Sequence, residues 1–309
     1  DTLCDQKRPV VLEKIDFPEP VISVVVEAKS SADQDKMVAG LERLAKEDPS
    51  SRLRRDPETG QMLLAGMGEL HLEILVDRLL REFKVGANVG KPQVSYREAI
   101  TKAAQAEGRY ERTVGNTVHH GHCYVRVEPL ATGKGLQIEV KVPESKVPKQ
   151  FHAPILQGLK ETLEIGPLAG FAVIDAKVVC YDGEFIQDTS NESGYRVAAG
   201  QAVREALKQA SPVLMEPVFE IEVSCPENYI GGVVGDLNSR RAKVNQISSR
   251  GDAQVIDAVA PLASLFGYAT DLRSISQGRA TFSMEFTHYS QVPERQAQEL
   301  MRTIDRKSV

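Results

Sequence analysis

The pattern of apolar and polar positions changes several times along the chain, and each change predicts a new element. Residues 21–28 form a β-branched run suited to a buried strand. Ser31 can cap the helix that follows, in which apolar residues recur at spacings of three and four. A polar turn at 56–60, which contains Pro and Gly, separates two expected strands at 52–55 and 61–65. The first part of the chain is therefore predicted as strand, helix and hairpin.

A second helix is expected over 68–83, and a last strand at 85–89 follows it. The predicted apolar face of this helix consists of Leu70, Ile74, Leu75, Leu79 and Leu80. The resulting order, βαββαβ, is the ferredoxin-like plan, and we place this domain at 13–90.

The same order recurs near the end of the chain, which predicts a second ferredoxin-like domain at 213–292. Its expected elements are strand 219–224, helix 231–243, strands 244–249 and 253–259, helix 261–273 and strand 280–286. Residues 293–309 form a terminal segment, in which a short helix is expected over 294–306.

Between these domains, residues 91–212 follow a different pattern, in which strands come first and helices later. The expected elements are strands 96–99, 108–113, 123–129 and 136–142, a helix over 151–163, a strand at 171–182 and a helix over 194–210. The segment just before 123 is expected to be a loop. The predicted fold class is α+β and multidomain, with two ferredoxin-like sandwiches flanking an α+β domain.

Composition describes a globular protein, with 41% hydrophobic and 26% charged residues among 309. No apolar run is long enough to span a bilayer and no secretory signal is visible, so we expect a soluble cytoplasmic protein. Four cysteines lie far apart without a C-x-x-C pair, which favours reduced thiols over disulfides or structural zinc. A formal net charge of −5 argues against nonspecific coating of nucleic acid, so local patches must supply any RNA contact.

Three imidazoles and a thiol at 119–123 form the densest group of candidate metal ligands. His120 and His122 would share one face of a strand, whereas His119 and Cys123 would point to the other face or lie in the loop. No distant C-x-x-C or H-x-x-x-H pattern supplies further ligands. A structural metal, an RNA-contacting strand edge and neutral surface histidines are the three interpretations, and we predict no metal site.

Motifs for catalysis are missing from the sequence. No G-x-x-x-x-G-K-[ST] loop is present to bind nucleotide phosphates, and no G-x-S-x-G elbow indicates a hydrolase. Basic residues gather at Arg240 and Arg241 and again at Arg273 and Arg279. Arginine forks beside small polar residues suit bidentate contacts with an RNA backbone, although solvated helix ends are the alternative. The sequence thus predicts binding rather than catalysis by this chain.

Three stretches carry a resemblance to a known family. They are PLASLFGYATDLRSISQGRATFSMEF at 261–286, ENYIGGVVGDLNSRRAK at 227–243 and GMGELHLE at 66–73. The amino-acid sequence resembles the third, fourth and fifth domains of bacterial translation elongation factor G. The resemblance implies that residues 1–12 end a preceding barrel domain and that a nucleotide-hydrolysing domain lies upstream. GTP and magnesium are therefore expected only in that missing domain, and no cofactor is expected here.

In that family the fourth domain is an elongated lever, similar in fold to a ribosomal small-subunit protein, and its tip meets messenger and transfer RNA. The resemblance places two tip loops at 114–122 and 184–193. Thr117 stands where the family commonly has arginine, and Ile186 stands where it has histidine. Loss of these groups predicts a divergent paralogue with a weaker hold on RNA. The candidate RNA-contacting residues are Gly115, Asn116, Thr117, His119, His120, His122, Ile186, Gln187, Ser190 and Asn191.

The resemblance also assigns roles to the outer domains. The fifth domain is implied to contact the sarcin–ricin loop and the stalk base of the large subunit, through Arg240, Arg241, Arg273, Gln277 and Arg279. The third domain couples nucleotide state to the rest of the factor in this family. Candidates for that coupling, which would otherwise only begin a helix, are Met67, Gly68, Glu69 and His71.

The sequence therefore predicts the ribosome-binding part of a translation factor that moves transfer and messenger RNA during protein synthesis. Its expected partners are both ribosomal subunits, ribosomal RNA, transfer RNA and messenger RNA, with the chain as a monomer and no membrane involved. Two alternatives stay open. One is a specialised paralogue for ribosome recycling or rescue, and the other is a metal-dependent or RNA-modifying enzyme that uses residues 119–122.

Overall fold

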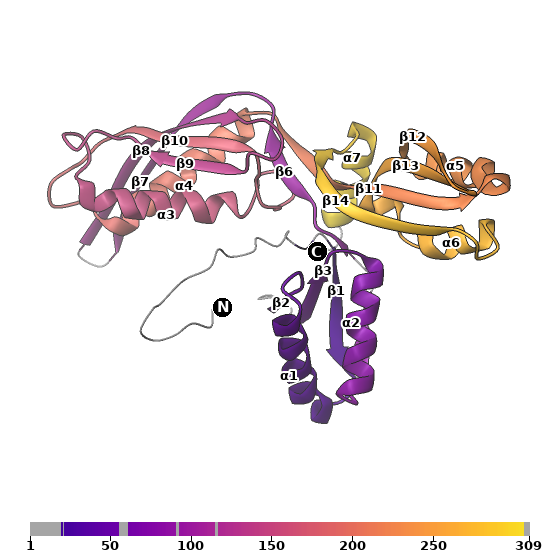
Figure 1. Ribbon diagram of the computed structural model, residues 1–309. Coiled ribbons are helices and arrows are strands. Elements are labelled where there is room, and N and C mark those ends of the chain that lie inside the picture. The colour runs from indigo at the N-terminus through magenta and orange to yellow at the C-terminus, as the bar shows by residue number, and fades with distance from the viewer. Residues whose placement is uncertain (1–19, 21, 56–60, 91–92, 115–116, 306–309) are drawn as a thin grey trace, which may run out of the picture. The chain divides into compact units, whose positions relative to one another are not determined.

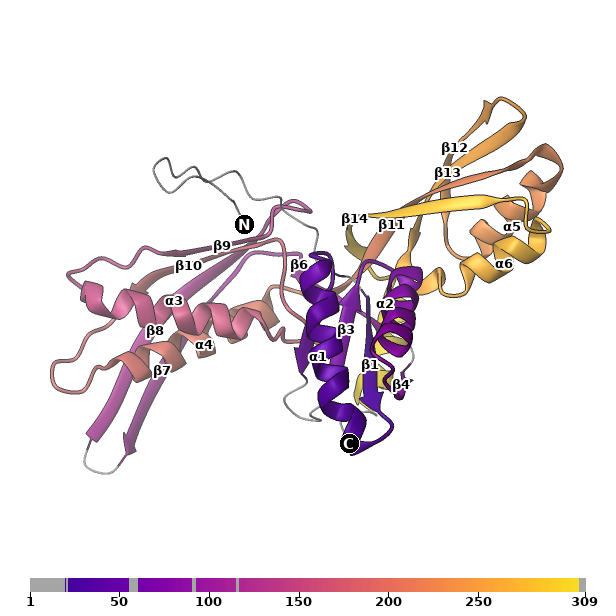
Figure 2. The same ribbon diagram turned by 60° about the horizontal axis from the view of Figure 1, so that its bottom comes forward.

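The computed structural model describes residues 20, 22–55, 61–90, 93–114 and 117–305. The chain divides into two compact units, Asp1–Ser95 and Tyr96–Val309. Figures 1 and 2 show their helices and strands from two directions. One sheet organises the first unit and two sheets organise the second. The predicted fold class, α+β with several domains, is confirmed.

The first unit is an antiparallel sheet with two helices packed on it. Its strand order β2-β3-β1-β4 is that of the ferredoxin-like fold, as predicted. Alternate residues of β1 are buried, because a strand that packs on one face buries every second side chain. The elements are β1 (Ile22–Ala28), α1 (Ser31–Glu47), β2 (Arg52–Arg55), β3 (Met62–Gly66), α2 (Glu69–Glu82), β4 (Ala87–Val89) and β5 (Gln93–Val94), which also pairs with β1.

Two details of the first unit differ from the prediction. Helix α1 is capped by Ser30 rather than Ser31, because the Ser30 hydroxyl accepts a hydrogen bond from the Asp33 backbone N–H at 3.3 Å. The buried face of α2 consists of Leu72, Leu75 and Leu79, whereas Leu70 and Ile74 are more than half exposed. At 3.6 residues per turn, Leu70 and Ile74 lie roughly opposite Leu72, so the predicted stripe combined two faces of the helix.

The C-terminal domain repeats the ferredoxin-like plan in the second unit, with strand order β12-β13-β11-β14. Strand β11 is the longest in the described chain and lies between β13 and β14. The elements are β11 (Pro212–Pro226), α5 (Ile230–Ser239), β12 (Lys243–Arg250), β13 (Ala253–Pro261), α6 (Tyr268–Ile275) and β14 (Thr281–Gln291), and helix α7 (Glu294–Asp305) follows.

Both helices of the C-terminal domain are shorter than predicted. Helix α5 ends at Ser239, because Arg241 adopts a left-handed φ of 63° and the Ala242 N–H donates back to the Leu237 carbonyl. Helix α6 begins only at Tyr268, after Gly267 with a φ of 74°. The helix predicted over 231–243 therefore ends about one turn early, and the helix predicted over 261–273 begins later than expected.

The central domain consists of a four-stranded sheet and two long helices. Its strand order is β7-β8-β10-β9, and only the β9–β10 pair is parallel. The core lies between the sheet and the helices and contains many valines, leucines and alanines that are completely buried. The elements are β7 (Ala104–Val114), β8 (Thr117–Pro129), β9 (Leu136–Val140), α3 (His152–Leu163), β10 (Ala176–Gly183) and α4 (Glu192–Gln209).

The central part of the chain corrects three predictions. Strand β8 begins at Thr117, so residues 119–122 lie in a strand and not in a loop. The predicted strand at 171–182 begins only at Ala176 and is preceded by an isolated bridge at Val173. Strand β6 (Arg97–Ile100) pairs with β11 of the C-terminal domain and not with the central sheet. In the described part of the chain, no helix combines the length and apolar character that crossing a membrane requires.

Candidate nucleic-acid interface

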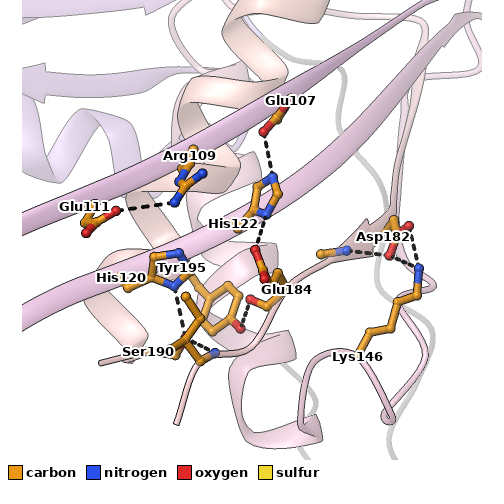
Figure 3. Close-up of polar contacts among 12 residues, drawn as sticks. Glu107, Arg109, Glu111, His120, His122, Lys146, Asp182, Glu184, Ser190 and Tyr195 are labelled. Atoms are coloured by element: carbon orange, nitrogen blue, oxygen red, sulfur yellow. Dashed lines mark hydrogen bonds and ion pairs between the residues drawn. The ribbon is translucent and has the colours of Figure 1, made fainter. Parts of the chain in front are cut away.

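The two predicted tip loops lie side by side in the central domain (Figure 3). The His120 N–H donates to the Thr189 carbonyl at 3.0 Å, and the Asn191 N–H donates to the His120 carbonyl at 3.3 Å. His120 and Ser190 form a parallel bridge although they are 70 residues apart in sequence. We call residues 117–122 and 184–191 the tip. Backbone hydrogen bonds therefore make the tip one surface.

Each histidine of strand β8 contacts a different residue of the second loop. His119 Nδ1 lies 3.3 Å from Asn191 Oδ1, and His120 Nδ1 lies 3.2 Å from Ser190 Oγ. His122 Nδ1 lies 3.3 Å from Glu184 Oε2. The histidines thus fasten the second loop to β8. In the described residues, no group of three or more His, Cys, Asp and Glu side chains is arranged to hold a metal ion.

His122 lies between two carboxylates. Its Nε2 is 2.8 Å from Glu107 Oε1 on β7, opposite the contact of its Nδ1 with Glu184 (Figure 3). The side chain is 9% exposed, whereas both glutamates are about half exposed. Because each ring nitrogen contacts a carboxylate, His122 links β7, β8 and the second loop.

His120 is the most deeply buried of the three histidines, with 1% of its surface exposed. Its Nε2 is buried and has no hydrogen-bond partner among the residues that the structure describes. Burial lowers the pKa of His120 below its usual value, and the positive charge of Arg109 lowers it further. The side chain is therefore neutral at pH 7 and faces the protein interior, although the sequence placed it among the RNA contacts.

Local contacts also fix the shape of the second loop. Ser190 Oγ accepts from the Ile186 N–H at 3.0 Å, and the Ser190 N–H donates back to the Ile186 carbonyl at 3.0 Å. Asn191 caps helix α4, with Oδ1 accepting from the Gly194 N–H at 2.8 Å. The Tyr195 hydroxyl donates to the Glu184 carbonyl at 2.8 Å, and burial raises its pKa to about 12. Ser190 and Asn191 consequently hold the loop in place.

The outward side chains of the second loop are chemically different from its inner ones. Ile186 is 38% exposed, and Gln187 is exposed as well. Phe185 is 39% exposed, and its ring centroid lies 5.8 Å from that of Phe151 on the central domain. Gly115 and Asn116 lie outside the described residues, and of Thr117 the structure describes the backbone in β8. Ile186, Gln187 and Phe185 are therefore available to a partner.

Glycines allow helix α4 to approach the hairpin of strands β7 and β8 closely. A Cβ on Gly121 would lie 2.2 Å from the Gly194 backbone, and one on Gly194 would lie 2.2 Å from the His120 carbonyl oxygen. Gly108 meets the same helix, because its Cβ would lie 2.0 Å from the Ala198 carbonyl oxygen. No other residue fits at these positions without displacing backbone. The sequence analysis did not identify these three glycines as determinants of the site.

The candidate arginines of the C-terminal domain are either held by internal contacts or exposed, and Arg240 is held by internal contacts. Its side chain is 12% exposed, and it contacts Asp236 at 2.8 Å and the Ser264 carbonyl at 2.9 Å. It also pairs with Asp271 and lies 5.2 Å from the Tyr268 ring centroid. Arg240 therefore joins the end of α5 to the start of α6.

Arg241 is also held by an internal partner. Its guanidinium makes two hydrogen bonds, of 2.6 and 3.2 Å, to the carboxylate of Glu216, which is 2% exposed. Arg273 and Arg279 are exposed, and their side chains have no ion pair within the described residues. Gln277 is exposed between them and accepts from the Tyr229 hydroxyl at 3.2 Å. A role of these residues in binding RNA stays a prediction.

The coupling candidates of the first unit surround the start of α2. His71 Nδ1 accepts from the Met67 N–H at 3.0 Å, and its Nε2 lies 2.6 Å from Asp48 Oδ2 beyond the end of α1. Burial acts to raise the pKa of Asp48, but hydrogen bonds from Ser50 and His71 outweigh it and lower that pKa. His71 therefore connects the two helices, with Gly68 as the N-cap of α2.

Comparison with known proteins agrees with the geometry. Family models match residues 17–91 as "Elongation Factor G, domain III", 92–211 as "Elongation factor G, domain IV" and 213–300 as "Elongation factor G C-terminus". The chain belongs to the elongation factor G family. The resemblance seen in the sequence is thereby confirmed, and the chain contains the C-terminal domains of such a factor.

Relatives show how much of a factor of the elongation factor G family this chain represents. It is 55% identical over 99% of its length to elongation factor G 1 of Bdellovibrio bacteriovorus, of which it covers 44%. It is 48% identical over 98% of its length to elongation factor G of Thermotoga maritima, again covering 44%. A solved structure from Thermus thermophilus matches 97% of the chain with a TM-score of 0.76, at 30% identity and covering 46% of that protein. The chain thus spans less than half the length of these relatives.

Proposed function

We propose that the chain is the ribosome-facing part of a translational GTPase that moves transfer and messenger RNA, with GTP hydrolysis supplied by a domain outside it. The observation that carries the proposal is the tip, in which two segments distant in the sequence form one surface held by backbone hydrogen bonds. A surface that is already ordered loses little conformational entropy on binding. Such a tip suits a part that must keep its shape while it enters an RNA-lined space.

The lack of basic side chains in the second loop of the tip supports the proposal that this chain is a divergent member of the family. The second loop, residues 184–191, contains Glu184 and Asp188 but no lysine or arginine. On the adjacent strand β7, Glu107 and Glu111 balance Arg109 and Arg112, so this strand adds no net positive charge. Phosphate contacts depend on positive charge. The tip therefore acts on RNA through its shape and its apolar outer residues more than through attraction to phosphate.

The C-terminal domain supplies the positive charge that the tip lacks. Arg273 and Arg279 are exposed beside Gln277, whose φ of 51° is left-handed. Exposed arginines beside a tight turn suit contacts with phosphate groups of ribosomal RNA. Arg240 and Arg241, which are held internally, position this surface. The binding free energy is accordingly assigned to Arg273 and Arg279.

Co-sedimentation with ribosomes tests the proposal directly. The 309-residue chain should pellet with ribosomes at low salt and dissociate as salt increases, because phosphate contacts release counterions. Calorimetry with GTP should give no binding, since the phosphate-binding loop is missing from this sequence. Failure to pellet at low salt, or stoichiometric GTP binding, would contradict the proposal.

A role in ribosome recycling or rescue is the second candidate, and the exposed Ile186 on a loop without basic residues favours it. In the full-length factor, Ile186→His should increase single-turnover translocation by about three- to tenfold if a lost hydrogen bond of about 1 kcal/mol limits the native factor. Gln187→His is the matched control on the same loop. If neither change affects translocation while the native factor splits ribosomes into subunits, the recycling role is supported instead.

A further inference from the structure

Strand β6 connects two parts of the second unit through a single residue, Glu98. One edge of β6 pairs with β11 of the C-terminal sheet, where Glu98 lies opposite Leu214. At its other edge the Glu98 N–H donates to the Ala172 carbonyl at 3.0 Å, and the Ile174 N–H donates to the Glu98 carbonyl at 2.8 Å. Glu98 thus belongs to the C-terminal sheet and contacts a segment of the central domain at the same time.

The side chain of Glu98 binds the same segment of the central domain. It is 1% exposed, and its Oε2 accepts from the Leu168 N–H at 2.9 Å. Its Oε1 accepts from the Ala169 N–H at 2.9 Å and the Phe171 N–H at 3.1 Å. A buried carboxylate is costly unless hydrogen bonds replace its water shell, and here three backbone amides do so. Such an arrangement holds a loop tightly and in one orientation.

The loop is shaped to receive this carboxylate. A Cβ on Gly166 would lie 2.2 Å from Glu98 Oε2, so only glycine leaves room for the side chain. The Gly166 N–H donates to the Phe171 carbonyl at 2.8 Å and closes the loop around the carboxylate. Just beyond it, the Val173 N–H donates to the Leu163 carbonyl at the end of α3, also at 2.8 Å. A continuous chain of contacts therefore runs from α3 through Glu98 to β11.

We infer that Glu98 is a positioning residue that fastens the central domain to the C-terminal sheet, so that α3 and β11 move as one body. Two strand connections alone would allow the domains to bend against each other about the start of β6 and β11. The five hydrogen bonds of Glu98 to residues 168–174 remove that freedom. This role does not depend on ribosome binding, and failure of the sedimentation test would leave it intact.

Hydrogen exchange on the 309-residue chain tests the anchor. In Glu98→Gln the side-chain NH₂ must face at least one backbone N–H, because an amide has one acceptor atom where the carboxylate has two. Exchange of the Leu168, Ala169 and Phe171 amides should become at least about tenfold faster, while that of β12 and β13 stays unchanged. Glu220→Gln, an exposed glutamate on β11, is the matched control and should change neither region.

A distance measurement then tests the joint itself. Spin labels at Lys160→Cys on α3 and Asp252→Cys beyond β12, both exposed, should report a distance distribution at least about twice as broad in Glu98→Gln as in the parent. Cys4→Ser serves as the background, and the other three cysteines are buried. Gly166→Ala should broaden the distribution as well, because it displaces the carboxylate without removing its charge.

The outcomes distinguish a rigid connection between the central domain and the C-terminal sheet from a general contribution of Glu98 to stability. Faster exchange confined to residues 166–174, together with a broader distance distribution in both variants, supports the inference. An unchanged distance distribution would overturn it, because the two domains would then be fixed by other contacts. Exchange that rises equally throughout the chain would also overturn it, since Glu98 would then act only on global stability.

Discussion

The tip of the central domain is held together by contacts between two segments about 70 residues apart, whereas the C-terminal domain holds Arg240 and Arg241 against carboxylates of its own helices and sheet. In both regions, polar residues with internal contacts hold the exposed residues in position. The exposed residues differ: at the tip they are Ile186 and Gln187, and in the C-terminal domain they are Arg273 and Arg279. The comparison separates a surface that acts by shape from one that acts by charge.

The largest effect should follow from Gly194→Ala at the tip. The added Cβ would lie 2.2 Å from the His120 carbonyl oxygen, so helix α4 and strand β8 must separate. We expect a loss of about 3 kcal/mol or more in the free energy of unfolding, measured by urea denaturation. Gly235→Ala on helix α5 is the control, because its Cβ would meet nothing within 4 Å, and it should be neutral or stabilising. Equal behaviour of the two variants would show that close packing does not define the tip.

Arg240→Ala should have the next largest effect and should act on the fold of the C-terminal domain. Removing this side chain leaves Asp236 and the Ser264 carbonyl without their partner, in a site where Arg240 is 12% exposed. Breaking such a pair costs about 2–4 kcal/mol, which a thermal or urea melt will detect. Arg43→Ala, whose side chain is 72% exposed in its ion pair with Glu47, is the control and should change stability by less than about 0.5 kcal/mol. An unaltered melt of Arg240→Ala would mean that Arg240 is free to bind RNA.

Arg273→Ala and Arg279→Ala should leave the melt unchanged and weaken ribosome binding. Each lost phosphate contact should reduce the slope of log affinity against log salt by up to about one unit. Lys160→Ala, an exposed change on α3, controls for the loss of a positive charge elsewhere. If both arginine variants bind like the parent at every salt concentration, the charged surface of the C-terminal domain lies elsewhere.

The smallest effect is a pH dependence of the tip. Burial lowers the pKa of His120 in the folded state below its usual value of 6.5, so the unfolded chain takes up this proton more readily. The stability contributed by neutral His120 is complete above pH 6.5 and is lost as the pH falls through the folded pKa. The charged and titratable groups near the ring are Arg109, Glu111, Glu184 and His122.

His120→Asn should flatten the dependence of the melting temperature on pH below 6.5, as followed by thermal melts at several pH values. His288→Asn, at a position where the histidine is exposed on β14, should keep the slope of the parent. A slope that His120→Asn leaves unchanged would assign the acid sensitivity to another group.

Much of the fold could be predicted from the sequence, because the period of the apolar positions reports which face of an element is buried. The two βαββαβ orders were recognised in this way. The errors have local causes that tertiary contacts decide. Strand β8 extends to Thr117 because residues 119–122 pair with β7. Three histidines and a glycine lack the residue pattern that predicts a strand. The buried face of α2 was misplaced because Leu70 and Ile74 are as apolar as the residues that pack.

The candidate site was predictable in part. The resemblance indicated two segments, 114–122 and 184–193, whose described residues the structure brings together, and basic clusters in the sequence drew attention to the arginines, whose role in binding RNA stays a prediction. It could not show that His120 faces the interior or that Arg240 is enclosed by Asp236 and two carbonyls. Exposure depends on what covers a side chain, and some of the covering groups, such as the Ser264 and Phe266 carbonyls, lie far from Arg240 in the sequence.

The sequence by itself determined the order of most elements and the family, because these depend on residue type and local spacing. The tertiary structure decided which polar residues face a partner and which support the fold. Glu98 illustrates the reason, since its three amide donors lie at least 70 residues further along the chain. A buried carboxylate is stable only where folding brings such donors together, and no local pattern in the sequence records that meeting.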